Sequence, residues 1–276
     1  MQRFFVVIAA LIVLGIGFGI VERLRPAAKG QRRFRAGFVT DLAWWLFTPT
    51  AGQLFTQVVV AVSLIALFAA LGSPMSAEDL RDLAGRETAV TRQPLLLQMV
   101  EFLVLADFIG YWQHRAFHTF DRLWRVHAVH HSSTEVDWLS SVRVHPLNDA
   151  IASTLVAAPL LLAGFAPATL AAYLPFLTLY AIFIHANVDW DLGPLRGVIS
   201  SPAFHRWHHA ADAEALDKNF AGLFVFWDRL FGTLYFPRGL KPKRFGIVGA
   251  QPPPSFLGQL VYPLRSPRGG AAAAAA

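Results

Sequence analysis

The chain has 276 residues, of which 55% are hydrophobic, 15% are charged and none is cysteine, and its formal net charge is +6. A soluble domain usually carries about a quarter charged residues, so this chain lacks the polar groups to cover its surface, which favours a membrane protein. The high hydrophobic content argues against intrinsic disorder, and the absence of cysteine excludes a disulfide-built secreted domain and a thiolate-ligated metal. The positive net charge is compatible with binding to anionic lipid and to nucleic acid, so it does not distinguish the two.

Residues 4–21 form the first apolar run without a charged residue, which is long enough for a membrane-spanning helix. The loop that follows is basic, and Glu22 is its single acid before Asp41. By the positive-inside rule this loop is cytoplasmic. A cleaved signal peptide is the alternative, but no clear small-residue cleavage site precedes the basic loop, so we expect the helix to be retained.

Two further spans and a polar loop follow along the chain. Trp44 and Trp45 are expected to anchor the second span, residues 54–71, at the membrane interface. The polar, nearly neutral segment 72–93 is predicted to be an external loop. The third span is predicted at residues 94–112.

Residues 150–184 contain no charged residue, and a turn between Gly164 and Pro167 divides them into two arms. Each arm is short for a full crossing at about 1.5 Å per residue, so we expect a membrane hairpin. Five crossings would leave residues 113–149 and 185–276 on the cytoplasmic side. Cleavage of the first helix would leave four crossings and the same sidedness.

These segments predict an all-α, polytopic membrane bundle with a histidine-rich catalytic cap on the cytoplasmic side. Residues 1–93 would form the N-terminal spans and the external loop, and residues 94–236 the domain that carries the histidines and the hairpin. Residues 237–276 are rich in proline and end in alanines, so they are predicted to be a disordered tail.

All ten histidines lie between residues 114 and 209. Residues 114–118 read HRAFH, residues 127–131 read HAVHH and residues 205–209 read HRWHH, while His145 and His185 occur singly. Positions i, i+3 and i+4 share one face of a helix, so the imidazoles of each motif can point at one ion. Two copies of the HxxHH spacing among apolar helices predict a metal site.

The number of histidines bears on the kind of metal. A zinc ion takes four ligands, so this set oversupplies one zinc site. Imidazole suits iron, copper, zinc and nickel, and two ions with four or five nitrogen ligands each would use the whole set. The spacing alone therefore predicts a multi-histidine metal site without choosing the metal.

The order of these motifs resembles the fatty acid hydroxylase/sterol desaturase superfamily. The resemblance covers residues 107–235 and includes HRxFH, HxVHH, HP, HxN and HRxHH, then DKNFAG at 217–222 and FWDRLFGT at 226–233. It implies an integral-membrane oxygenase with two iron ions, which uses O₂ and external electrons to hydroxylate or desaturate a C–H bond of a lipid.

The resemblance also implies roles for single residues. Asn219 would orient a water or a ligand imidazole. Asp107 would accept an N–H from a ligand histidine, with a charge at the helix end as the alternative. His145 would support the ligands or serve as an extra one. The metal ligands would be His114, His118, His127, His130, His131, His185, His205, His208 and His209.

The expected partners are a lipid from the bilayer and a separate electron-donor protein of the ferredoxin or cytochrome type, with no nucleic acid. The chain has no GxGxxG after a strand and no haem-type His-Pro-Gly-Gly, so the electrons come from outside. Five arginines between the histidine motifs would receive an acidic carrier or lipid headgroups: Arg115, Arg122, Arg125, Arg143 and Arg206. We expect the inner membrane of a bacterium, with the active site on its cytoplasmic side.

Other functions fit less well. A desaturase or an ether-lipid monooxygenase of the same superfamily is the nearest alternative to a hydroxylase. A histidine-rich metal transporter is remote, because transporters need ionisable groups within their spans and most of these spans have none. A zinc metalloprotease is excluded because no HExxH is present.

Overall fold

The computed structural model describes residues 2–72, 76 and 87–265, and over these residues it is helical without a regular β-strand. This confirms the predicted all-α class. Parts of the predicted external loop and tail, residues 73–75, 77–86 and 266–276, lie outside the described residues. The α-helices are α1 (Gln2–Leu24), α2 (Phe38–Phe47), α3 (Gln53–Ala70), α5 (Leu95–Thr119), α6 (Asp121–His131), α7 (Pro146–Leu162), α8 (Pro167–His185), α9 (Pro202–His208), α10 (Phe226–Leu230) and α11 (Phe256–Val261).

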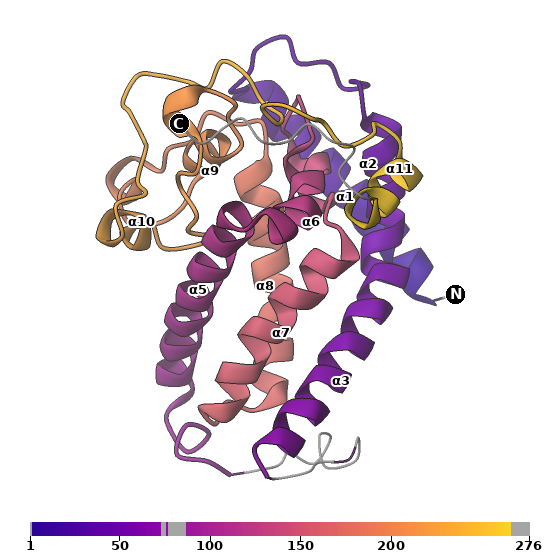
Figure 1. Cartoon of the computed structure of the whole chain (residues 1–276). Helices are drawn as coiled ribbons and strands as arrows, with labels where there is room; N and C mark the ends of the chain where they lie inside the picture. Colours follow the sequence, from indigo (N-terminus) through magenta and orange to yellow (C-terminus); the bar gives the residue numbers. More distant parts are fainter. Residues whose placement is uncertain (1, 73–75, 77–86, 266–276) are drawn as a thin grey trace.

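The helices form a bundle below a cap (Figure 1). Helices α3, α5, α7 and α8 run along the bundle, and α6, α9, α10 and their loops lie above it. Phe102 of α5 and Leu160 of α7 are buried in the bundle core, where the Phe102 ring stacks on Tyr173 of α8 at a centroid distance of 4.4 Å. The predicted hairpin arms are α7 and α8.

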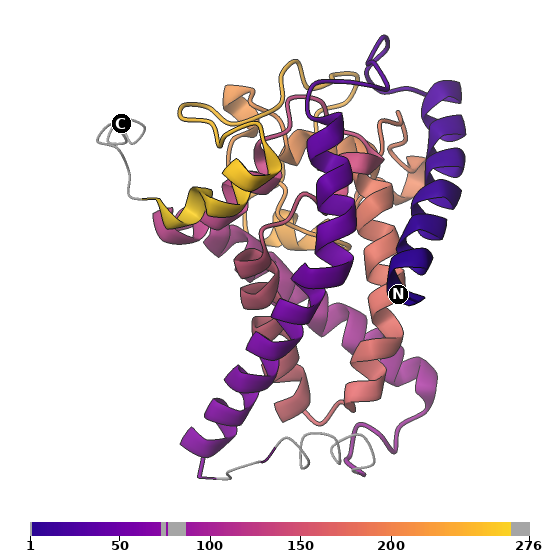
Figure 2. The same cartoon turned by 90° about the vertical axis from the view of Figure 1, so that its right-hand side faces the viewer.

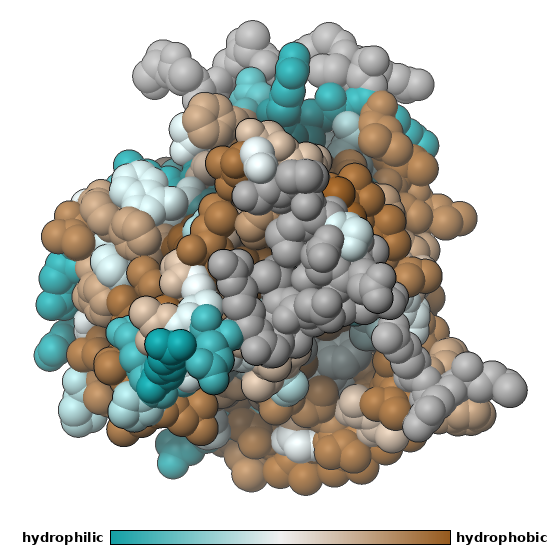
Figure 3. All heavy atoms as spheres, turned by 90° about the horizontal axis from the view of Figure 1, so that it is seen from below, coloured by the Kyte–Doolittle hydropathy of each residue, from teal (hydrophilic) through white to brown (hydrophobic). Residues whose placement is uncertain are grey.

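Four helical segments are long and apolar enough to cross a membrane: Phe4–Leu24, Phe38–Ala70, Leu95–Thr119 and Pro167–His185. Helix α7 is apolar but shorter. Seen from the end opposite the cap, apolar side chains predominate around the bundle, with hydrophilic groups in smaller clusters (Figure 3). Because an aqueous surface disfavours so many exposed apolar side chains, the chain is an integral membrane protein.

The second span is longer than predicted, because α2 continues into α3 through a π-helical turn at Thr48–Gly52. Pro49 in this turn cannot donate a backbone hydrogen bond, which accounts for the local irregularity. The interpretation of Trp44 and Trp45 as interfacial anchors is wrong. Both are buried, and their indole N–H groups donate to the Gln259 side chain (2.8 Å) and the Leu139 carbonyl (3.0 Å).

The prediction of disorder from residue 237 is wrong for residues 237–265. Helix α11 and the 3₁₀ turn Tyr262–Leu264 pack on α2 and α6. The Phe256 ring meets Trp44 edge-on at 4.9 Å, and Gln259 is fully buried. The proline-rich composition hides these contacts because their apolar partners come from a distant part of the chain.

Helix α1 lies beside the cap-side part of α8 (Figure 2). Near its C-terminal end, Glu22 accepts the backbone N–H groups of Trp138 (3.1 Å) and Asn187 (2.8 Å). Pro26 then forms a β-bridge with Val188. These contacts hold the chain immediately after His185, so α1 helps to position the histidine region.

A buried ion network ties the loop after α6 to the start of α2. Arg35 reaches Asp41 at 2.7 Å and Asp137 at 2.5 Å, and Arg143 reaches Asp41 at 2.6 Å. The nearby carboxylates raise the pKa of Arg35 against the opposing effect of burial. Because each charge is paired, the network can be buried and stiffens the cap.

Candidate metal centre

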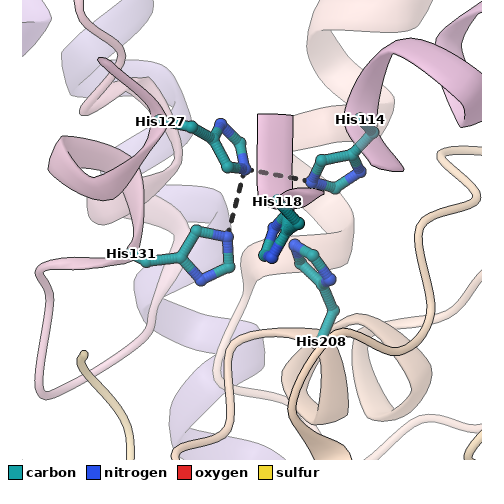
Figure 4. A group of neighbouring side chains, drawn as sticks. All are labelled: His114, His118, His127, His131 and His208. Carbon is teal, nitrogen blue, oxygen red and sulfur yellow. Dashed lines mark hydrogen bonds between the residues drawn. The ribbon is translucent and has the colours of Figure 1, made fainter. Parts of the chain in front are cut away.

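Nine histidines converge in two adjoining groups in the cap. Site A has five members, and site B has four. Within each site, the nitrogen atoms that could bind one ion all lie within 4.8 Å of one another. In Figure 4 the five rings of site A point toward a common centre. Site A contains His114, His118, His127, His131 and His208, and site B contains His130, His185, His205 and His209.

Each HxxHH motif divides its histidines between the two sites. In α6, the i, i+4 pair His127 and His131 belongs to site A, and His130 belongs to site B. Around α9 the arrangement is reversed, because His205 and His209 belong to site B and His208 belongs to site A. Both elements therefore bridge the two sites, which the shared helical face alone did not predict.

Backbone carbonyls set the orientation of several rings. The Nδ1 atoms of His114, His185 and His208 lie 2.8, 2.6 and 2.9 Å from the carbonyl oxygens of Phe220, Ala181 and Lys218. A carbonyl oxygen only accepts, so each Nδ1 carries the proton and each Nε2 keeps its lone pair. This is the arrangement in which a histidine binds a metal through Nε2.

The spacing of the Nε2 atoms fits a cation better than hydrogen bonds. In site B, the Nε2 of His185 is 3.1 Å from the Nε2 atoms of His130, His205 and His209. One lone pair cannot form three hydrogen bonds, so these atoms would repel one another without a cation between them. Two nitrogens about 2.1 Å from one ion and at right angles are about 3.0 Å apart, close to the observed separation.

The buried lone pairs in site A lead to the same interpretation. In the part of the chain that the structure describes, the Nε2 atoms of His118 and His208 are buried without a hydrogen-bond partner. Both rings turn toward the centre of the site in Figure 4. Such orphaned polar atoms are rare in a folded protein, and a metal ion would satisfy them.

Electrostatics keeps the histidines in the form that binds a metal. Burial, and then the neighbouring imidazoles, lower the pKa of six histidines well below the ordinary value of 6.5. They are therefore neutral at physiological pH and need no proton loss to bind an ion. The six are His127, His130, His131, His205, His208 and His209.

Over the described residues, the Asn219 side chain makes no hydrogen bond to a histidine ring, so it does not hydrogen-bond a ligand imidazole directly. It is fully buried with a left-handed φ of 61°, and its side chain binds the backbone of Tyr235 through both amide atoms (2.7 and 2.8 Å). The backbone carbonyls of its neighbours Lys218 and Phe220 accept hydrogen bonds from the Nδ1 atoms of His208 and His114. Asn219 therefore acts on site A through the loop.

Asp107 does not accept from a ligand histidine either, and it is not a free charge at a helix end. Its carboxylate accepts the backbone N–H groups of Leu223 and Phe224, both at 2.7 Å. Asp228 makes the same kind of contact with Phe220 (2.8 Å) and Ala221 (2.9 Å). Asp107 thus holds the segment that follows Asn219 against α5, and Asp228 holds the start of that segment against α10.

His145 belongs to neither site. Its Nδ1 accepts the Leu147 N–H at the start of α7, and its Nε2 donates to the Leu260 carbonyl (2.9 Å). His145 can act on site A only indirectly, by capping the start of α7. This helix also carries Asn148, whose side chain lies 2.9 Å from the Nδ1 of His127. Two of the arginines proposed to bind a carrier or headgroups, Arg143 and Arg206, are buried.

Sequence reasoning missed Asn148 and Asp217 as partners of ligand histidines. The Asp217 carboxylate lies 3.2 Å from the Nδ1 of His118 and is largely exposed. Asp217 is part of the DKNFAG motif, so the motif drew attention to the segment but not to this contact. Asn148 follows His145 by three residues, and no feature of the sequence connects it to His127.

Residues 99–233 match the model of the fatty acid hydroxylase family. An alkylglycerol monooxygenase of Danio rerio is 37% identical over 45% of this chain and 27% of its own length. An ornithine lipid hydroxylase of Rhizobium tropici is 34% identical over 62% of this chain and 51% of its own length. A sphinganine C4-monooxygenase of Arabidopsis thaliana is 28% identical over 74% and 76% of the two chains.

The chain thus spans 27% and 51% of the length of the first two relatives. No solved structure matches it significantly.

Proposed function

Because the chain belongs to the fatty acid hydroxylase family through residues 99–233, we propose that it is a membrane oxidoreductase that hydroxylates a lipid. It would use O₂ and electrons from a separate donor protein of the ferredoxin or cytochrome type. The observation that carries the proposal is the pair of all-histidine sites with Nε2 atoms 3.1 Å apart.

The residues fit two iron ions, with five ligands in site A and four in site B. Bound iron supplies the one-electron and O₂ chemistry that side chains lack. The chain's own part is to hold the imidazoles neutral and oriented, through the carbonyls of Ala181, Lys218 and Phe220. Site B has fewer protein ligands, so it is the better candidate for an open position.

A lipid substrate is supported by the position of the sites and by the relatives. His114 and His118 lie in the last turns of α5, and His185 ends α8, so these histidines are at the ends of two helices that are long and apolar enough to span a membrane. The names of three relatives specify an alkylglycerol, an ornithine lipid and sphinganine. These molecules differ in their polar parts and share long alkyl chains, which supports attack on a lipid C–H bond.

Two further activities of the same superfamily are alternatives. Ether-lipid cleavage is favoured by the 37% identity to an alkylglycerol monooxygenase. Desaturation would begin with the same attack on a C–H bond and is distinguished by its product.

The cap is proposed to face the cytoplasm of a bacterium. The loop after α1, which contains Arg25, Lys29 and Arg32, lies at the cap end of the molecule (Figure 1). Basic loops stay on the cytoplasmic side. The membrane would then be the bacterial inner membrane.

The test compares lipids from cells that express the chain and cells that express a His127→Ala/His208→Ala variant, grown under ¹⁸O₂. We expect a lipid with one ¹⁸O atom only with the intact chain, and a variant Arg229→Gln on the exposed cap surface should behave like the intact chain. An unchanged lipid profile would contradict lipid oxidation. Iron analysis of the purified chain should give about two ions, and one ion or none would contradict the di-iron assignment.

A further inference from the structure

A cavity of about 720 Å³ lies on the cap, beside α9 and outside both histidine sites. Its walls come from the loop after α1, the segment between α8 and α9, and the chain that follows α10. This volume is within the range of pockets that bind small molecules. Helix α9 lies toward the end of the molecule away from the bundle (Figure 1), so the cavity is on the aqueous side.

The charges around the cavity are mainly positive. The cavity lining contains two acidic residues and four basic residues, and each acidic residue lies close to one of the basic ones. Asp189 pairs with Lys241 at 2.6 Å, and Asp191 lies 3.6 Å from Arg196. Arg206 and Arg238 are left without an ion pair in the part of the chain that the structure describes.

Arg206 is the central feature because it is only 3% exposed. Its Nη1 donates to the Val136 carbonyl at 2.8 Å, and its guanidinium lies over the Phe245 ring at 4.6 Å. Over the described residues, its Nε and Nη2 atoms have no hydrogen-bond partner. Neither atom is among the buried polar atoms that lack a partner, so both open into the cavity and can donate to an anion there. The carboxylates of Glu22, Asp137 and Asp189 attract the Arg206 charge, but none forms an ion pair with it among the described residues.

The sequence around Arg206 explains why it faces the cavity. It follows His205 directly, and successive residues of a helix point about 100° apart. While His205 and His209 face site B, Arg206 and Ala203 line the cavity on another side of α9. One short helix thus separates the cavity from the histidines.

Arg196 makes the wall rigid. Its guanidinium stacks on the Phe236 ring at 3.7 Å and donates to the carbonyls of Phe236 and Pro237. These contacts fix the loop that carries Arg238 and Lys241 at the mouth of the cavity.

We propose that this cavity binds a phosphate group, with Arg206 as its principal donor and Arg238 at its rim. A guanidinium offers parallel N–H groups that match phosphate oxygens, and such charge-assisted bonds are strong. The phosphate belongs either to a water-soluble phosphate ester or to a lipid headgroup. The site is distinct from the oxidation centre and does not depend on the proposed function.

The test measures binding to the full chain in nanodiscs of neutral lipid, with inorganic phosphate and glycerol 3-phosphate as the soluble probes. A second set of nanodiscs contains phosphatidic acid. We expect saturable binding and a higher Tm with phosphate, and no such change with chloride at equal ionic strength. A change with the soluble probes indicates an aqueous ligand, and a change only with phosphatidic acid indicates a headgroup.

Arg206→Gln should weaken binding about tenfold or more, because it removes charge-assisted hydrogen bonds. Arg238→Gln, an exposed rim change that leaves the fold intact, should weaken it several-fold, and Arg229→Gln should bind as the unaltered chain. Metal content is measured in parallel to show that α9 is intact. The proposal is overturned if no probe saturates at millimolar concentration, or if Arg238→Gln and any folded Arg206→Gln protein bind like the unaltered chain.

Discussion

Asn219 offers the sharpest test of how the cap holds site A. Its side chain has no hydrogen bond to a histidine among the described residues, yet the carbonyls on either side of it accept hydrogen bonds from the Nδ1–H groups of His208 and His114. Its own side chain binds the Tyr235 backbone, and its φ of 61° requires the left-handed conformation. Two substitutions separate these contributions. Asn219→Gly removes the side chain and tolerates the conformation, and Asn219→Ala disturbs both.

The expected loss follows from the contacts. Removing the amide leaves the N–H and C=O of Tyr235 without their partner in a partly buried position, which costs about 2–4 kcal/mol in total. Alanine adds about 1 kcal/mol, because a Cβ disfavours the left-handed conformation. We expect Asn219→Gly to lower Tm by about 10 °C and Asn219→Ala by a few degrees more.

The assay combines thermal unfolding in detergent with metal analysis of the purified protein. Both variants should lose metal from site A before site B, because His114 and His208 both belong to site A. If Asn219→Gly kept the full metal content and the original Tm, the loop would not position the ligands as argued. Equal losses in the two variants would refute the role of the left-handed conformation.

Three further predictions concern the metal sites and the N-terminal helix. Replacing His208 by alanine removes a ligand of site A, and replacing His205 removes one of site B, so each variant should keep about one ion of two in metal analysis; complete loss in both would mean that the sites are not separate. Because burial lowers the pKa of the six histidines named above, the unfolded chain binds more protons than the folded one below the ordinary value of 6.5. The Tm of the metal-free protein should therefore be constant above that pH and fall as the pH decreases below it, whereas a Tm that is flat through the acid range would contradict the pKa shifts. Finally, Glu22→Ala removes the acceptor of the Trp138 and Asn187 N–H groups, so limited proteolysis should cut the loop after α1 faster than in a Glu22→Gln control, and equal rates would show that Glu22 does not anchor the helix.

Several features follow from local sequence. Hydrophobic runs of membrane length predicted the helical class and most of the spans, because the bilayer sets the length of an apolar helix. The spacing of HxxxH and HxxHH predicted that the eight histidines of these motifs would gather at a metal site, because i, i+3 and i+4 share a helical face, and the resemblance added His185. The structure brings all nine together.

Errors arose where a partner is distant in the chain. In the sequence, Trp44 resembles an interfacial anchor, but its indole donates a hydrogen bond to Gln259, more than two hundred residues later in the chain. The same contact holds the proline-rich C-terminal segment in place. Asp107 is an acidic residue in an apolar helix, and only the tertiary structure shows that its carboxylate accepts hydrogen bonds from the backbone N–H groups of Leu223 and Phe224.

The sequence by itself determined that this chain is a helical membrane protein with a multi-histidine centre, because composition and helical periodicity are local properties. Only the tertiary structure decided how the histidines divide into two sites, since that division depends on how α5, α6, α8 and α9 meet. It also decided that His145 stands apart and that Arg206 faces a cavity. The direction of a side chain relative to distant helices is a property of packing, which the spacing of residues along the chain does not contain.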